Sequence, residues 1–320
     1  MREVTVGVSG ELVRLLGFTV SRERDGATLR DLLRRDYGFS RTLMSRIRQD
    51  GYITINDDEA MMWNMVSTGD QVEIFLPESP SPGVVPEDIP IDVVYEDDDV
   101  LVLNKPPGLV VHPTKGHPRG TLANAVAYYW KQLGLRITVR PVHRLDRDTS
   151  GLLLFAKNAY ADQHLSEQLT TGRMKRRYWA LTEGVIQPAE GTIELRIGIA
   201  SDPDLREVSP RGQVAITRYR TLETWEHHCL VDIELLTGRT HQIRAHFSYL
   251  GHPLVGDGRY GASPTELLQR TGLHAKELSF YHPVKRERIT LATELPQDLH
   301  RALEALRSGH SGGASRRAAH

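Results

Sequence analysis

The fold-determining stretch is His143-Arg144-Leu145-Asp146-Arg147-Asp148-Thr149-Ser150-Gly151, which leads directly into the apolar segment Leu152-Leu153-Leu154-Phe155-Ala156. An apolar run of this length predicts a buried strand. The polar nonapeptide would therefore stand at the end of a rigid core element, where side chains can be held in place for chemistry. The same residues also suit a plain charged turn, because Asp and Ser side chains hydrogen-bond nearby backbone and Gly tolerates positive φ. The residues alone leave both interpretations open.

The sequence around this stretch predicts many strands and few helices. We expect strands at 91–95, 100–104, 108–111, 151–157, 175–182, 191–197, 214–224, 229–236 and 284–292, and helices at 121–133, 159–170, 240–251 and 297–307. Strands that follow one another with few helices between them predict an α+β fold on a large, mostly antiparallel sheet.

The N-terminal part has a different pattern. Leucines and other apolar residues at helical spacing over 27–50 predict two helices, which a Gly stop and a Ser N-cap separate at Tyr37-Gly38-Phe39-Ser40. Strands are expected at 52–56 and 71–76. Five prolines in 77–90 predict a semi-rigid extended linker. We therefore expect a small domain at 10–76, a linker at 77–90, a large domain at 91–307 and a disordered Gly/Ser-rich tail at 308–320.

Composition limits the class of protein. The chain has 320 residues, 39% of them hydrophobic and 25% charged, which is typical of a globular protein of about two domains. The apolar runs are too short to cross a membrane, and the N-terminus lacks a signal-peptide pattern. The single cysteine, Cys229, excludes an internal disulfide and is expected to be a buried core thiol. We expect a cytoplasmic protein with no membrane partner.

The net charge of −1 does not by itself indicate a nucleic-acid partner, but the charges are segregated. Residues 87–99 contain seven acids and no base, whereas residues 173–177 contain four bases and no acid. A local basic patch is what contacts phosphate.

Further motifs lie on either side of the nonapeptide. They are Asn104-Lys105-Pro106-Pro107-Gly108-Leu109-Val110-Val111-His112-Pro113, then Lys175 with Tyr178 and Ala180, then Leu236-Thr237-Gly238-Arg239-Thr240-His241-Gln242-Ile243-Arg244, and then Gly256-Asp257, Tyr260-Gly261, Leu273-His274-Ala275 and His282-Pro283. In this order they resemble the RluA-type pseudouridine synthases, and in particular the RluD-like enzymes of large-subunit ribosomal RNA. The resemblance spans roughly residues 90–295. It implies the pseudouridine synthase fold, with a large mixed, mostly antiparallel sheet flanked by helices, and an enzyme that isomerises uridine in RNA.

The resemblance also implies roles for individual residues. Asp146 would be the catalytic aspartate and Arg239 the arginine that pairs with it, although an arginine at a helix start can also be a surface residue. Tyr178 would stack on the uracil and could serve as a general base; the alternative is a core tyrosine. Arg144 would fill the gap left by the flipped base or bind the backbone phosphate, and Leu236 and Ile243 would line the uracil pocket.

The chemistry makes its own demands on these residues. A base inside an RNA helix must be flipped out before an enzyme can act on it. A carboxylate buried without a partner is costly, so Asp146 needs a cation or hydrogen-bond donors. Asp146 could attack the uracil ring, attack the anomeric carbon or remove a ribose proton, and the sequence does not choose. Asp148 would face the other way on an extended chain, which disfavours a hydrolase with two flanking carboxylates.

The N-terminal pattern resembles the small RNA-binding module first seen in ribosomal small-subunit protein four, a small α/β module. It departs from that module at Asn56-Asp57-Asp58, where Asn-Gly is usual. The exposed arginines would then contact RNA, although arginines on short helices can also form a solvated face. The expected RNA contacts are Arg30, Arg34, Arg41, Arg46 and Arg48 in the module, with Lys175 and Arg176 in the large domain.

Partners and cofactors follow from the same patterns. No His-x-x-x-His pair with a nearby acid surrounds the nonapeptide, so we predict no metal and no other cofactor. The expected partner is RNA, with ribosomal RNA first and transfer RNA second, and the chain is expected to be a monomer. The alternatives are a noncatalytic RNA-binding protein that uses the same fold as a platform, and a metal-dependent hydrolase.

Overall fold

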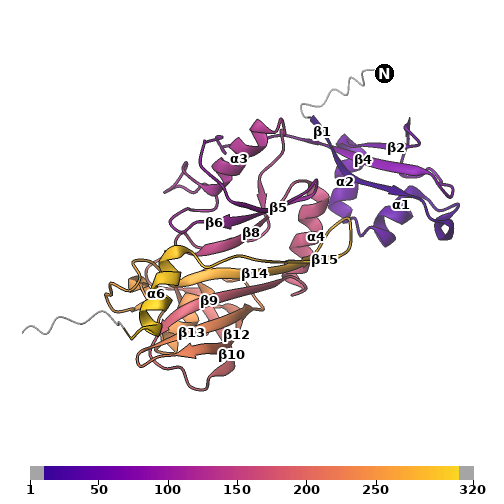
Figure 1. Cartoon of the computed structure of the whole chain (residues 1–320). Coiled ribbons are helices and arrows are strands. Elements are labelled where there is room, and N and C mark those ends of the chain that lie inside the picture. Colours follow the sequence, from indigo (N-terminus) through magenta and orange to yellow (C-terminus); the bar gives the residue numbers. More distant parts are fainter. Residues whose placement is uncertain (1–10, 310–320) are drawn as a thin grey trace, which may run out of the picture.

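The computed structural model describes residues 11–309. It contains two sheets, a small one near the N-terminus and a large one that carries most of the chain (Figure 1). The prediction of a disordered tail at 308–320 lies outside the described residues except for Ser308 and Gly309, which end the last helix. No helix among the described residues is long and apolar enough to span a bilayer.

The small sheet has the order β1-β4-β2-β3 and is antiparallel throughout. Its strands are β1 (Glu11–Thr19), β2 (Tyr52–Ile55), β3 (Asp58–Glu59) and β4 (Gln71–Glu78), and its helical segments are η1 (Arg22–Arg24), α1 (Leu29–Asp31), η2 (Leu32–Asp36) and α2 (Arg41–Asp50). Ser40 caps α2 by accepting from the Leu43 amide, as the sequence predicts. Strand β1 was not among the predicted elements.

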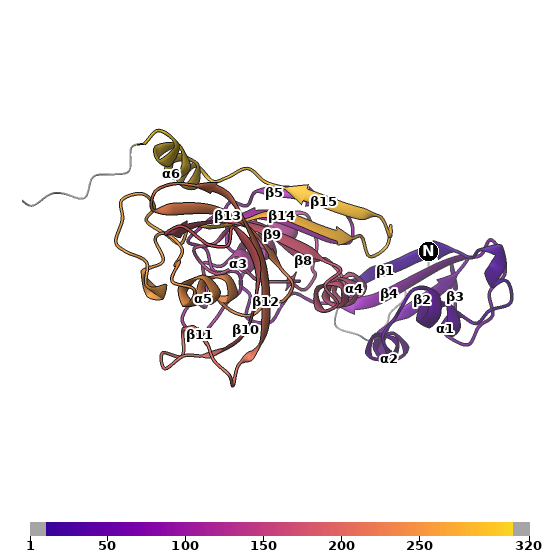
Figure 2. The ribbon, with the colours of Figure 1, turned by 90° about the horizontal axis from the view of Figure 1, so that it is seen from below.

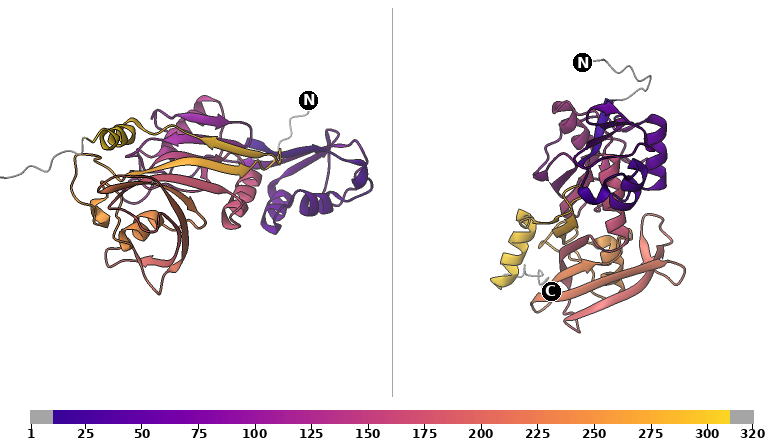
Figure 3. Two further views of the ribbon diagram at one scale, coloured as in Figure 1. Left: turned by 60° about the horizontal axis from the view of Figure 1, so that its bottom comes forward. Right: turned by 90° about the vertical axis from the view of Figure 1, so that its right-hand side faces the viewer.

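The small domain packs against helix α4 (Ala159–Thr170) of the large domain, and the views of Figures 2 and 3 show the two domains joined there. Tyr160 lies in the hydrophobic core of the small domain, and its hydroxyl donates to the Tyr37 carbonyl over 3.0 Å. Gln163 bonds the backbone of both Gly38 and Ser40. These contacts hold the two domains in one arrangement.

Residues 77–90, which the sequence predicts as a linker, are packed against the large domain over part of their length. Strand β4 extends to Glu78, whose buried carboxylate binds Arg140 of the large domain over 2.7 Å. The segment that follows lies against the large domain, with Val84 in its hydrophobic core and the Val85 carbonyl bonded to Asn124. Prolines keep this segment out of a helix, as predicted, but its contacts make it part of the large domain's surface.

The large sheet has eleven strands in the order β11-β10-β12-β13-β9-β14-β8-β6-β5, with β15 paired to β14 and β7 to β8. Their bounds are β5 (Val93–Glu96), β6 (Val100–Lys105), β7 (Arg140–Pro141), β8 (Ser150–Ala156), β9 (Lys175–Glu183), β10 (Glu190–Ile199), β11 (Arg206–Val208), β12 (Gln213–Thr224), β13 (His228–Leu235), β14 (Leu273–Tyr281) and β15 (Arg288–Ala292). Only β14 and β8 pair in parallel among the described strands. The prediction of a mixed, mostly antiparallel sheet is therefore confirmed.

Helices cover both faces of this sheet. Helices α3 (Leu122–Gln132) and α5 (Gln242–Tyr249) pack on one face, and α4 and α6 (Gln297–Arg307) pack on the other. Side chains along a strand alternate between the faces. On β6, Leu101 and Leu103 join the core under α3, while Val100 and Val102 join the core under α4. Cys229 is buried, as predicted.

Some predicted elements differ from the structure. Residues 108–111 form no strand, because Gly108 has a φ of 83° and turns the chain. Strand β15 begins at Arg288, four residues later than predicted, after a turn in which Arg286 has a φ of 59°. Strand β14 was missed as a strand, although the motif Leu273-His274-Ala275 lies at its start.

Candidate active site

The charged nonapeptide forms a turn at the start of β8. The Thr149 amide donates to the Asp146 carbonyl over 3.2 Å, and the strand begins one residue later. The second residue of this strand, Gly151, has no room for a larger side chain. Its φ is 108°, and a Cβ there would stand 2.2 Å from the Ala275 carbonyl oxygen on β14. Strands β8 and β14 thus approach closely just behind Asp146.

Two buried cations hold this turn by its backbone. The Lys105 ammonium donates to the carbonyls of Pro106, Leu109 and Arg147 over 2.8–2.9 Å. Burial lowers the pKa of Lys105 to about 7, against the charges of Asp148 and Asp146. On the other side, Arg270 donates to the Asp148 carbonyl over 3.1 Å.

Arg270 is itself fixed by Asp298 of α6, which it binds through Nε and Nη2 over 2.6 and 3.0 Å. The C-terminal helix is therefore connected to the turn through one arginine. Cations on two consecutive carbonyls leave the backbone after Asp146 little freedom.

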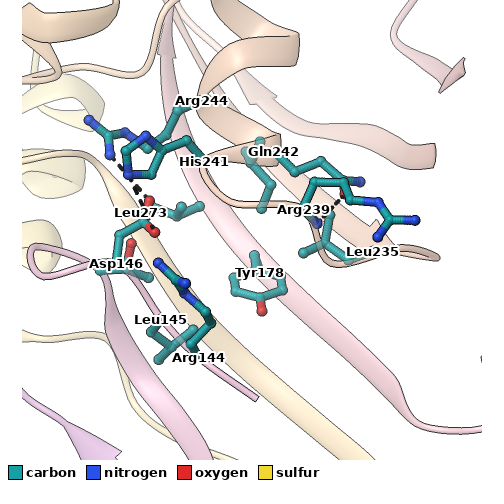
Figure 4. A pocket seen from close by; sticks show the side chains of 12 residues that line it. Arg144, Leu145, Asp146, Tyr178, Leu235, Arg239, His241, Gln242, Arg244 and Leu273 are labelled. Carbon is teal, nitrogen blue, oxygen red and sulfur yellow. Dashed lines mark hydrogen bonds and ion pairs between the residues drawn. The ribbon is translucent and has the colours of Figure 1, made fainter. Parts of the chain in front are cut away.

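The carboxylate of Asp146 faces helix α5 (Figure 4). Arg244 donates from Nη1 to Asp146 Oδ2 over 3.2 Å, and His241 Nε2 lies 3.9 Å from Oδ1. His241 precedes the helix in the left-handed conformation, with a φ of 55°, so its ring turns toward the aspartate. Burial lowers the pKa of His241 despite the opposing charge of Asp146, so near neutral pH the cation in contact with Asp146 is Arg244.

Arg244 is shared between two carboxylates. It binds the buried Asp257 through Nε and Nη2 over 2.6 and 2.8 Å, and its guanidinium lies 4.6 Å from the Tyr260 ring centre. Burial alone would lower the pKa of Arg244, but the Asp257 hydrogen bonds and the charges of both carboxylates raise it. The fork on Asp257 orients the guanidinium so that its remaining nitrogen points at Asp146.

A pocket with a free volume of about 50 Å³ opens beside Asp146. Tyr178, Leu235, Ile243 and Leu273 provide its apolar walls. The exposed Arg144 reaches between Asp146 and Tyr178 and is the lining side chain most free to move when a base enters (Figure 4).

Tyr178 forms the floor of this pocket from strand β9 and is 4% exposed. Burial raises the pKa of its hydroxyl, and the charge of Asp146 raises it further. The phenolate is therefore scarce near neutral pH, which suits a stacking surface better than a general base.

Comparison with known proteins agrees with this geometry. Residues 99–249 match a family model described as RNA pseudouridylate synthase. A Bacillus subtilis protein named uncharacterized RNA pseudouridine synthase YhcT is 39% identical, with 89% of this chain and 95% of that protein covered. This chain belongs to the RNA pseudouridylate synthase family.

Members of this family are isomerases that convert uridine in RNA into pseudouridine. Ribosomal large subunit pseudouridine synthase D of Haemophilus ducreyi is 36% identical over 76% of this enzyme and 78% of its own length. Among solved structures, human RNA pseudouridylate synthase domain containing 1 is 28% identical, with a TM-score of 0.53 over 69% of this chain and 96% of its own. The predicted family and fold are confirmed.

The predicted pairing of Arg239 with Asp146 is wrong. Arg239 precedes α5 and is exposed, and its Nε donates to the Val214 carbonyl over 3.1 Å. It borders the pocket, but its guanidinium points away from the aspartate (Figure 4). Arg244 takes the pairing role because helix α5 presents it to Asp146.

Two further site predictions need correction. Leu235, not Leu236, lines the pocket, because successive side chains on a strand point to opposite faces. Arg176 was expected to contact RNA but is only 6% exposed, and it donates to the Thr237 carbonyl over 3.2 Å. It supports the turn before α5 from inside the protein. Asp146, Tyr178, Arg144 and Ile243 all border the pocket, as expected.

The predicted RNA-binding residues of the small domain lie on its surface. They are exposed, and none forms an ion pair within the part of the chain that the structure describes: Arg30, Arg34, Arg41, Arg46 and Arg48. Lys175 is different, since it pairs with Glu234 over 3.1 Å. Their contact with RNA stays a prediction.

The sequence reasoning missed Arg244, His241, Asp257 and Tyr260 as parts of the site. All four lie in the motifs that resemble the family, so the sequence indicated that these positions matter but did not predict their contacts.

One group of described residues has metal-ligand geometry. The ligand atoms of Asp97, Asp99 and His282 lie within 4.8 Å of one another, away from the pocket. His282 and Lys285 already bind Asp97 over 2.9 Å each, and these contacts lower its pKa despite burial. A cation would have to displace these partners, so the group is better explained as a structural ion-pair network.

Proposed function

We propose that this enzyme isomerises specific uridines of large-subunit ribosomal RNA and that Asp146 is its catalytic residue. The role of Asp146 is supported by the position of its carboxylate, which lies at a pocket with apolar walls and is held there by Arg244. The ribosomal target is supported by relatives that carry that substrate in their names, such as synthase D of Haemophilus ducreyi.

The reaction breaks the bond between N1 of uracil and C1′ of ribose, rotates the base and joins C5 to C1′, with a proton lost from C5 and gained at N1. The target base leaves its RNA stack and enters the pocket as Arg144 moves aside. Asp146 acts on the nucleotide through its carboxylate, which Arg244 holds in position. Tyr178, Ile243 and Leu235 hold the uracil ring while it is detached.

Residues 10–76 serve as an RNA-binding module, joined through 77–90 to a catalytic domain at 91–307. The support is the set of exposed arginines that pair with no carboxylate among the described residues, with Arg30 in α1, Arg34 in η2, and Arg41, Arg46 and Arg48 in α2. Charge-assisted contacts from such arginines to phosphate position RNA without reading its sequence.

The test of the chemistry is Asp146→Asn, with Asp148→Asn as the matched control. Asp148 lies two residues away, pairs with Arg147 and borders no part of this pocket. We expect pseudouridine formation in a ribosomal RNA transcript to fall by several orders of magnitude in the first variant and to change little in the second. Pseudouridine formed at a normal rate by Asp146→Asn would refute the assignment.

The target is tested separately, by mapping pseudouridine in total RNA from cells with and without the gene. Loss of sites in large-subunit ribosomal RNA supports the proposal. Loss of pseudouridine in transfer RNA alone would replace ribosomal RNA with transfer RNA as the target. If the enzyme is active in vitro but no site is lost in cells, neither RNA is its target.

A further inference from the structure

The small domain exposes an apolar tip that the contacts described so far do not use. Trp63 is 70% exposed, Met65 69% and Met61 47%, and the three follow one another at alternate positions. Large apolar side chains exposed together usually mark a binding surface. Trp63 is also the only strongly exposed tryptophan among residues 11–309.

This tip is held rigidly. The Asn64 side chain accepts from the Met61 amide over 2.7 Å, and the Asn64 amide donates to the Met61 carbonyl over 2.9 Å, so residues 61–64 form a closed turn. The turn is then fixed to the start of α1, because the amides of Leu29 and Arg30 donate to the carbonyls of Asn64 and Met62. A backbone that is already ordered loses little entropy when the side chains it carries bind a partner.

Charge decides which partner fits. The backbone bond from Arg30 to Met62 places the aromatic tip beside the first of the unpaired arginines, and Arg34 follows one turn later. Asp57, Asp58 and Glu59, which precede the tip in the chain, are exposed and would repel phosphate. A partner that carries a flat uncharged ring next to an anionic backbone therefore fits in one orientation, with its phosphate at Arg30 and its ring on Trp63.

We propose that Trp63, flanked by Met61 and Met65, is a stacking platform for an unpaired base of the RNA substrate, next to a stem whose phosphates bind Arg30 and Arg34. This inference rests on the proposed RNA-binding function of the small domain and names the RNA element that it recognises. The hydrogen bonds between the two domains start from residues 36–40 and from Glu78 and Ser79, and none involves 60–66 within the described residues. The platform therefore stays open while the target uridine is in the pocket.

The recognised base is accordingly not the target uridine. It is a second unpaired nucleotide that selects RNAs whose loop and target lie at the right separation. Base stacking on an aromatic side chain is sequence-tolerant, so the platform reads RNA shape rather than base identity.

The test uses the full-length enzyme and two probes, an RNA stem-loop and the same stem-loop with abasic sites in its loop. Trp63→Leu removes the ring and keeps an apolar side chain, Trp63→Phe keeps a ring, and Ile199→Ala removes an equally exposed apolar side chain outside the domain. We expect Trp63→Leu to weaken binding of the intact stem-loop by about 5- to 150-fold. Trp63→Phe should retain most of the affinity, and Ile199→Ala should change nothing.

The abasic probe isolates stacking from charge. It should bind the wild-type enzyme as weakly as Trp63→Leu binds the intact probe, and Trp63→Leu should bind both probes equally. The salt dependence should be unchanged by Trp63→Leu, whereas Arg30→Gln with Arg34→Gln should flatten it. Tryptophan fluorescence should respond to the intact probe far more than to the abasic one.

Several outcomes would overturn the inference. Equal losses of affinity for both probes, or no loss in Trp63→Leu, would show that no base stacks there. A change from dimer to monomer in sedimentation of Trp63→Leu would assign the tip to a second copy of the chain. None of these readouts depends on isomerisation, so a failed Asp146 assignment and a failed platform remain distinguishable.

Discussion

Arg244 offers the sharpest test of how the site is built, because it serves two carboxylates at once. Removing one partner of a buried ion pair costs about 3–5 kcal/mol, since the other charge is left uncompensated. Arg244→Gln leaves two carboxylates behind, the buried Asp257 and the partly exposed Asp146. We expect it to lose about 3–5 kcal/mol in the free energy of unfolding and nearly all isomerase activity.

Neutralising each carboxylate in turn should show how much of the lost unfolding free energy comes from Asp257 and how much from Asp146. Arg244 gives Asp257 two short hydrogen bonds and gives Asp146 one bond of 3.2 Å. Adding Asp257→Asn to Arg244→Gln should therefore restore more stability than adding Asp146→Asn. Coupling energies between contacting residues run from about 0.5 to 3 kcal/mol. We expect the coupling of Arg244 with Asp257 to be about 3 kcal/mol and that of Arg244 with Asp146 to be about 1 kcal/mol.

Urea unfolding of the single and double variants measures these couplings directly. Arg239→Gln is the matched control, an arginine five residues earlier that is exposed and binds only a backbone carbonyl through its side chain. It should cost under about 0.5 kcal/mol and show no coupling to Asp146→Asn. Additive losses for Arg244 with both carboxylates, or a coupling of Arg239 as large as that of Arg244, would refute the geometry described here.

Three more predictions concern other parts of the site and core. Tyr178→Phe should keep most single-turnover activity and Tyr178→Leu should lose it; failure of both would show that the hydroxyl also acts. The pKa of Lys105 is about 7, so as pH rises its ammonium loses one of the three N–H groups that bind three carbonyls. We therefore expect kcat to fall above neutral pH. Lys105→Met should lower kcat and abolish this pH dependence. Burial lowers the pKa of His143 to about 3 and of His246 and His274 to about 4, so the unfolded chain binds more protons below pH 6.5. Stability should fall on acidification from pH 6.5 toward 4, by up to about 1.4 kcal/mol per pH unit for each histidine, and a flat thermal-unfolding profile would contradict this.

The elements that the sequence predicted well are those whose pattern is local. Helix α6 was predicted at its observed bounds, because Leu299, Ala302, Leu303 and Leu306 repeat at helical spacing and face one core. Helix α4 was equally clear, with Asn158 as its N-cap. Strand β14 was missed although it lies in the middle of the sheet. Its parallel pairing with β8 joins residues more than a hundred positions apart, which no local pattern records.

The small domain shows the same limit. Its helical region was recognised, but β1 was not, because its alternation of apolar and polar residues is broken by Leu15-Leu16 at an irregularity in its pairing with β4. The linker was read from its prolines alone. Whether such a segment is free or packed depends on the surface beneath it, which here is the core under α3 that Val84 enters.

The site was found from its motifs, yet its central ion pair was assigned to the wrong arginine for a physical reason. Arg239 and Arg244 flank the start of α5, and the choice between them depends on the rotation of that helix about its axis. His241 enters the helix in a left-handed backbone conformation that the sequence does not reveal, and Asp257 binds Arg244 with two of its nitrogens. The carboxylate of Asp257 thus helps to orient the arginine that reaches Asp146. The pairing is a property of three segments packed together, so only variants that break the pairs one at a time can establish it.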